Sequence, residues 1–98
     1  MITRIVRMEF MEDKTQTFEE IFQNSRELIR ARQGCSYLSL HQDEDNKQVY
    51  YTISRWDSPA DLEAYRQSEL FKTTWAATKI LFSAKPIAYS LAPLQELG

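Results

Sequence analysis

Polar and apolar residues alternate at both ends of the chain, which is the pattern of a β-strand with one buried face. In residues 2–10 the more apolar face carries Ile2, Val6, Met8 and Phe10, while Thr3, Arg7 and Glu9 lie on the other. Residues 87–91 alternate in the same way, and residues 35–42 and 48–56 are predicted as two further strands, the latter rich in β-branched and aromatic residues. The polar segment 43–47 is short enough to join these two as an antiparallel hairpin.

From about Thr15 the spacing of apolar residues changes to that of a helix. One helical face carries Phe18, Ile21, Phe22, Leu28 and Ile29. Thr17 and Glu20 fit a capping box at the start. Gly34 is the expected end, because glycine adopts a left-handed backbone conformation at low cost.

A second helical region is predicted to begin at Ser58, which is followed by a first-turn proline, Pro59, and by the carboxylate of Asp61. It is expected to bend or restart near Ser68, whose hydroxyl could cap a second segment. An apolar stripe then continues to Ala84 through Leu70, Phe71, Trp75, Thr78, Leu81 and Phe82. Pro86 ends the helical region.

The predicted order of elements is β-α-β-β-α-β, within one domain that spans residues 1–98. It indicates an α+β, ferredoxin-like fold with a four-stranded antiparallel sheet and both helices on one face. The strands carry apolar side chains on both faces, so one apolar face would remain in water unless two copies form a homodimer. In residues 48–56 either set could face the helices; we favour Val49, Tyr51 and Ile53 over Tyr50, Thr52 and Ser54.

Composition excludes several classes of function. The net charge of −2 and the scattered lysines and arginines argue against nucleic-acid binding. Arg4 and Arg7 interrupt the apolar run at the start of the chain, so we expect neither a signal peptide nor a membrane span, and a cytoplasmic protein. One cysteine and one histidine cannot form a standard zinc site, and no metal site is predicted.

The segment "RWDSPADLEAYRQSELFKTTW" (55–75) ends a strand with Trp56, caps a helix at 57–61, and places Tyr65 before "S-x-x-F", Ser68 to Phe71. Together with "QGC" at 33–35, it resembles the signature of the antibiotic biosynthesis monooxygenase (ABM) domain family, over nearly the whole chain. The resemblance implies a dimeric α+β barrel, in which two sheets face each other and each subunit has a pocket between its sheet and helices. The best-known members use no metal or flavin cofactor, because the deprotonated phenolic substrate itself passes an electron to oxygen.

A haem-degrading branch of that family has an asparagine on the first strand and a haem-ligating histidine ten residues after an aromatic residue near the position of Tyr65. In this chain the first strand lacks asparagine and the later position is Trp75. Tryptophan has no lone pair to donate to iron. Haem binding through another ligand is therefore only a minor alternative.

Five residues are candidate substrate contacts: Tyr65, Phe71, Trp75, His41 and Arg7. The three aromatic residues would wall the pocket, and the Tyr65 hydroxyl could bind a ligand oxygen. His41 is the only side chain with an ordinary pKa near neutrality, and Arg7 could donate to a phenolate or a carboxylate. Three of them also have a structural explanation: Trp75 as core, His41 at a solvated strand end, and Arg7 paired with a carboxylate such as Glu9. No catalytic residue is assigned.

Two functions of different classes follow. The first is a cofactor-independent monooxygenase that acts on a quinol-like or polycyclic phenolic molecule, since that chemistry needs a dry apolar pocket with a few donors rather than a catalytic triad. The second is a non-catalytic dimeric module that binds a small aromatic or lipid-like molecule. The first is the primary hypothesis, although the absence of an evident acid–base pair counts in favour of the second.

Overall fold

The fold is a sheet of four strands with three α-helices packed against it, in a computed structural model that describes residues 1–98. The strands are β1 (Ile2–Glu9), β2 (Cys35–Gln42), β3 (Val49–Trp56) and β4 (Ile87–Leu91). The helices are α1 (Thr15–Arg30), α2 (Pro59–Arg66) and α3 (Glu69–Lys79), and a short 3-10 turn, η1 (Glu12–Lys14), precedes α1. The predicted strands and their order along the chain are confirmed.

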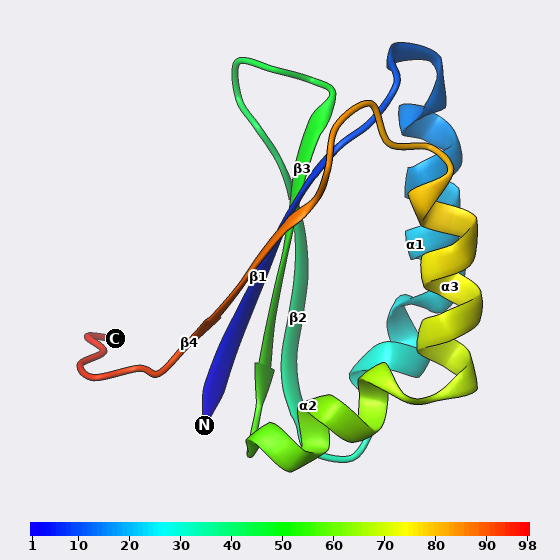
Figure 1. Cartoon of the computed structure of the whole chain (residues 1–98). Coiled ribbons are helices and arrows are strands. Elements are labelled where there is room, and N and C mark those ends of the chain that lie inside the picture. Colours follow the sequence, from blue (N-terminus) through cyan, green and yellow to red (C-terminus); the bar gives the residue numbers. More distant parts are fainter.

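The sheet order is β2-β3-β1-β4, and every neighbouring pair is antiparallel. All the helices lie on one side of the sheet and leave the other side open (Figure 1). This is the predicted α+β, ferredoxin-like arrangement. None of the helices is long and apolar enough to cross a membrane.

The two serine caps of the second helical region are confirmed. The Asp61 backbone N–H donates to Ser58 Oγ at 3.1 Å, and the Phe71 N–H donates to Ser68 Oγ at 3.1 Å. Ser68 therefore divides the region into α2 and α3, because its extended backbone breaks the helix while its hydroxyl caps the next one.

The predicted capping box at Thr17 is wrong, as are two predicted helix ends. Helix α1 follows directly from η1, with Lys14 before its first residue and no side-chain cap. It ends at Arg30 rather than at Gly34, and α3 ends at Lys79 rather than near Ala84. Gly34 instead lies in the turn before β2 with a φ of +83°, where a Cβ would clash with the Asp61 carboxylate.

Side chains alternate between the two faces of the sheet, so the burial of a few of them shows which positions face the helices. Met8 of β1 pairs with Tyr50 of β3, and Tyr50 is only 2% exposed. Its ring packs in the core, and its hydroxyl donates to Glu19 Oε2 at 2.5 Å. The expectation that Tyr51 and Ile53 pack under the helices is therefore wrong, because the even-numbered residues of β3 take that face.

Two buried clusters hold the helices to the sheet. The larger consists of Met8, Phe10, Phe18, Tyr50 and Leu81, and the smaller of Cys35, Trp56 and Leu62. Leu28, predicted on the inner face of α1, is 60% exposed, whereas Ser25 is buried and donates from its hydroxyl to the Ile21 carbonyl at 2.9 Å. The buried Ser25 also lines a cavity that members of both clusters border.

Candidate functional site

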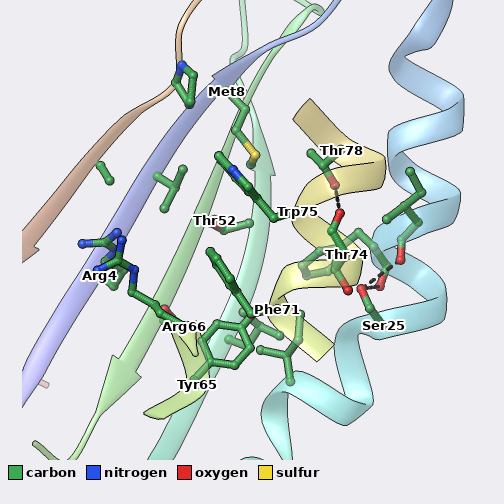
Figure 2. A pocket seen from close by; sticks show the side chains of 18 of the residues that line it. Arg4, Met8, Ser25, Thr52, Tyr65, Arg66, Phe71, Thr74, Trp75 and Thr78 are labelled. Atoms are coloured by element: carbon green, nitrogen blue, oxygen red, sulfur yellow. Dashed lines mark hydrogen bonds between the residues drawn. The ribbon is translucent and has the colours of Figure 1, made fainter. Parts of the chain in front are cut away.

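A cavity of about 340 Å³ lies between the helix-facing side of the sheet and the helices, and members of both buried clusters line it. Thirteen of its 21 lining residues are hydrophobic, so it suits a mostly apolar ligand. The helices supply most of the aromatic residues, whereas aliphatic, hydroxyl and arginine side chains come from both the strands and the helices (Figure 2). The size is that of a site for a small organic molecule.

Four aromatic rings form a continuous wall along one side of the cavity. The Trp56 ring stacks on Tyr65 with centroids 5.0 Å apart, and Tyr65 meets Phe71 edge-on at 5.2 Å. Phe71 stacks parallel to Trp75 at 5.9 Å. Trp56 is 1% exposed and donates from Nε1 to Ser54 Oγ at 3.0 Å, whereas Phe71 and Trp75 are only partly buried. Trp56 thus anchors the wall, and the other rings have surface left for a ligand.

The structure places three of the five predicted contact residues, Tyr65, Phe71 and Trp75, on this cavity. Burial raises the pKa of Tyr65 to about 12; the Cys35 side chain adds to the rise and Arg32 opposes it. With this raised pKa the phenol is neutral at physiological pH, so its hydroxyl can donate a hydrogen bond to a ligand.

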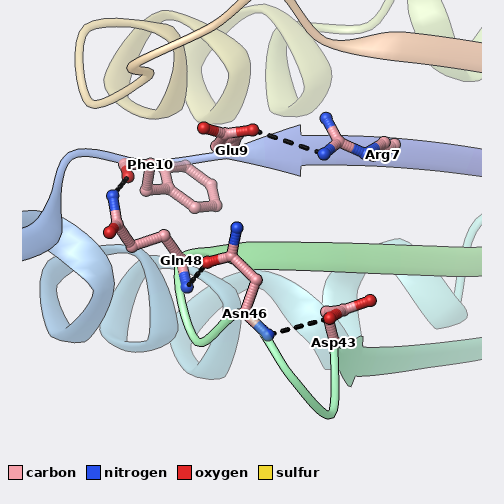
Figure 3. A network of polar contacts seen from close by, with 6 residues as sticks. All are labelled: Arg7, Glu9, Phe10, Asp43, Asn46 and Gln48. Carbon is pink, nitrogen blue, oxygen red and sulfur yellow. Dashed lines mark hydrogen bonds and ion pairs between the residues drawn. The ribbon is translucent and has the colours of Figure 1, made fainter.

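Arg7 and His41 do not line the cavity, which corrects the prediction that they share this site. Both are odd-numbered strand residues paired with Tyr51, on the open face of the sheet. Arg7 forms an ion pair with Glu9 at 3.3 Å (Figure 3), and His41 Nε2 is hydrogen-bonded to Ser39 Oγ at 2.9 Å. Because the cavity lacks histidine, it also provides no imidazole to ligate haem.

The acidic hairpin between β2 and β3 has a structural role. The Asp43 carboxylate accepts from the Asn46 backbone N–H at 2.8 Å, and the Gln48 side chain donates to the Phe10 carbonyl at 2.9 Å (Figure 3). These bonds fix the turn and tie it to the end of β1. No group of three His, Cys, Asp or Glu side chains that could hold a metal ion is found in the chain.

Several polar residues that line the cavity were not predicted from the sequence. Arg4, Thr52 and Ser54 enter the cavity from the strands, and Arg66 and Thr74 from the helices. The signal for Arg4 was present, because it occupies an even-numbered position between Ile2 and Val6 on the face of β1 that is otherwise apolar. For Thr52 the signal was hidden by the wrong choice of inner face on β3.

A family model identifies the family of the chain, and solved structures share its fold. Residues 1–77 match the family model described as antibiotic biosynthesis monooxygenase. The structure of Rv0793 from Mycobacterium tuberculosis is 22% identical and has a TM-score of 0.91, with 99% of this chain and 98% of that chain covered. PA3566 from Pseudomonas aeruginosa is 23% identical, with a TM-score of 0.85 and coverage of 96% and 94%.

A further structure, described as an antibiotic biosynthesis monooxygenase, is 14% identical, with a TM-score of 0.91 and coverage of 97% of this chain and all of that one. At these identities the structural matches establish the shared fold alone. No curated protein matches the sequence.

Proposed function

The chain belongs to the antibiotic biosynthesis monooxygenase family, and from this premise we propose that it is a cofactor-independent monooxygenase of a phenolic, quinol-like small molecule. The observation that carries the proposal is the aromatic-walled cavity of about 340 Å³ between sheet and helices. Its size and apolar lining suit a flat ring system, and Phe71 and Trp75 offer ring faces or edges for it to pack against.

The cavity offers what oxidation of a phenolate by oxygen requires of a protein. Apolar walls exclude water from a reactive intermediate, and donors stabilise negative charge on the ligand oxygen. The hydroxyls of Tyr65, Thr52 and Thr74 are among the donors that line the cavity. The substrate supplies the electron, so the protein's part is to bind, orient and shield it.

Oxygen uptake by metal-free protein, measured with a panel of hydroquinones and anthrones, tests this function. Substrate-dependent uptake that saturates and exceeds the rate without protein is the expected result. Saturable binding without any uptake would contradict the oxygenase and support the non-catalytic binding module.

We also propose that two copies associate through the open face of the sheet. That face carries Ile5, Tyr51 and Ile53, and continues onto Ile87 and Tyr89 of β4, which are 43% and 50% exposed. Covering such a patch would recover about 25 cal/mol for each Å² of apolar area removed from water. The facing sheets would then form the dimeric barrel.

Replacing Ile53 by glutamate is expected to dissociate the dimer and leave the helices folded. Ile53 lies opposite Ile5 and Ser39 in the middle of that face, where a carboxylate at the interface would lose its hydration. Sedimentation measures the dissociation, and circular dichroism measures whether the helices remain folded. The control is Leu28→Glu, because Leu28 is 60% exposed on α1, away from the sheet. A wild-type protein that is monomeric at micromolar concentration would disprove the dimer.

Tyr65→Phe is expected to lower affinity for a phenolic ligand and to change the free energy of unfolding by no more than about 1 kcal/mol. The ring keeps its stack on Trp56, and the lost hydroxyl has no hydrogen bond within the chain. Isothermal calorimetry and chemical denaturation measure the two effects. Unchanged affinity combined with a clear loss of stability would show that the hydroxyl is structural.

A further inference from the structure

Two arginines line the cavity together, although most of its surface is apolar. Arg4 comes from β1 and Arg66 from the last turn of α2. Both lie at the same side of the cavity, across from Thr74 and Thr78 (Figure 2). Their charges act on one another, since Arg66 helps to lower the pKa of Arg4.

The positive charge of this pair is not balanced inside the cavity. None of the lining residues is an aspartate or a glutamate. Arg66 pairs only with the exposed Glu63 at 3.3 Å, and Arg4 takes part in none of the three ion pairs of the chain. The one side-chain hydrogen bond of Arg4 runs from Nη1 to Ser90 Oγ at 2.9 Å, which leaves most of its donors free.

Burial is the largest cause that lowers the pKa of Arg4, followed by the like charge of Arg66, with Glu63 opposing both. Arginine nevertheless stays protonated in proteins. A partly buried cation beside a second cation is unfavourable on its own, and an anion between them would relieve both effects. The guanidinium plane also matches a carboxylate with two parallel hydrogen bonds.

We infer that the ligand of this cavity is an aromatic carboxylic acid, whose carboxylate Arg4 and Arg66 bind while its rings lie against Phe71 and Trp75. The inference rests on the proposed function for the aromatic part of the ligand and adds the acidic group. The arginines would fix one end of the molecule and thereby determine which ring carbon lies deepest in the cavity.

The test compares 6-hydroxy-2-naphthoate with 6-hydroxy-2-naphthamide, in which a neutral amide of similar size replaces the carboxylate, by isothermal calorimetry. The wild-type protein should bind the acid at least about tenfold more tightly than the amide, a preference typical of a charge-assisted pair, and added salt should reduce it. Arg4→Gln should abolish most of the preference, and Arg4→Lys should keep part of it. Arg26→Gln, on α1 and outside this cavity, should leave it unchanged.

Equal affinity of the wild-type protein for acid and amide would overturn the inference, as would a preference that survives in the Arg4→Gln, Arg66→Gln double variant. Failure of both molecules to bind would also overturn it. Oxygen uptake separates this inference from the proposed function. Turnover of neutral phenols without preference for acids refutes the inference alone, whereas an Arg4-dependent preference without oxygen uptake refutes the oxygenase alone.

Discussion

Replacing Phe10 by alanine is expected to destabilise the protein by about 3–5 kcal/mol, the usual cost of removing a buried phenylalanine ring. Phe10 is fully buried and lies at the centre of the larger cluster. Its ring stacks on Phe18 at 4.2 Å and contacts Phe82 at 5.2 Å and Tyr50 at 5.6 Å. Because a small domain has a net stability of only about 5–15 kcal/mol, this single change removes a large part of it.

Urea denaturation followed by circular dichroism measures the loss. Leu28→Ala is the matched control, since that leucine is 60% exposed on α1 and its truncation should change stability by less than about 0.5 kcal/mol. Equal effects of the two variants would show that the cluster around Phe10 does not hold the helices to the sheet.

Trp75→Ala is expected to produce the largest loss of ligand affinity, about tenfold to a hundredfold for a bicyclic phenol. The indole is stacked parallel to Phe71 and meets Phe82 edge-on at 5.5 Å, so it is held in place while its remaining surface lines the cavity. Since Trp75 is only partly buried, its removal should destabilise the fold less than Phe10→Ala does.

Calorimetry with 6-hydroxy-2-naphthoate and denaturation of the same preparation measure the two effects of Trp75→Ala. Trp75→Phe is the control, because a smaller ring in the same place should retain part of the affinity. If alanine at this position leaves affinity unchanged, Trp75 is part of the core and not of a binding wall.

Local signals in the sequence predicted the elements well. Ser58 and Ser68 cap their helices as expected because a serine cap depends on a few neighbouring residues. The end of α1 was harder to predict, because residues 31–33 all favour helix and no breaker precedes Gly34. The close approach of Gly34 to Asp61, which is distant in sequence, is visible only in the folded chain.

The inner face of β3 could not be predicted from propensity. Both sets of alternating side chains contain a tyrosine, and the β-branched residues of the set with Tyr51 favoured the wrong one. Tyr50 faces inward because Glu19, on α1, accepts its hydroxyl and so makes burial of that polar end favourable. Such a partner is visible only after the helix is placed on the sheet.

The residues of the candidate site were also predicted only in part. Phe71 and Trp75 were found because they are one helical turn apart on an apolar stripe. Arg7 and His41 were chosen for their chemistry, and strand parity placed them on the other face of the sheet. Arg4, in contrast, occupies an even-numbered position of β1, whose side chains face the helices and the cavity.

The proposed function and the inferred ligand both depend on where a ligand binds. A crystal structure with a brominated 6-hydroxy-2-naphthoate, located by the anomalous signal of bromine, tests this directly. We expect the rings in the cavity against Phe71 and Trp75, with the carboxylate beside Arg4. Binding confined to the open face of the sheet, or to the cleft between α1 and β2 that Arg26 and Leu40 line, would contradict the account.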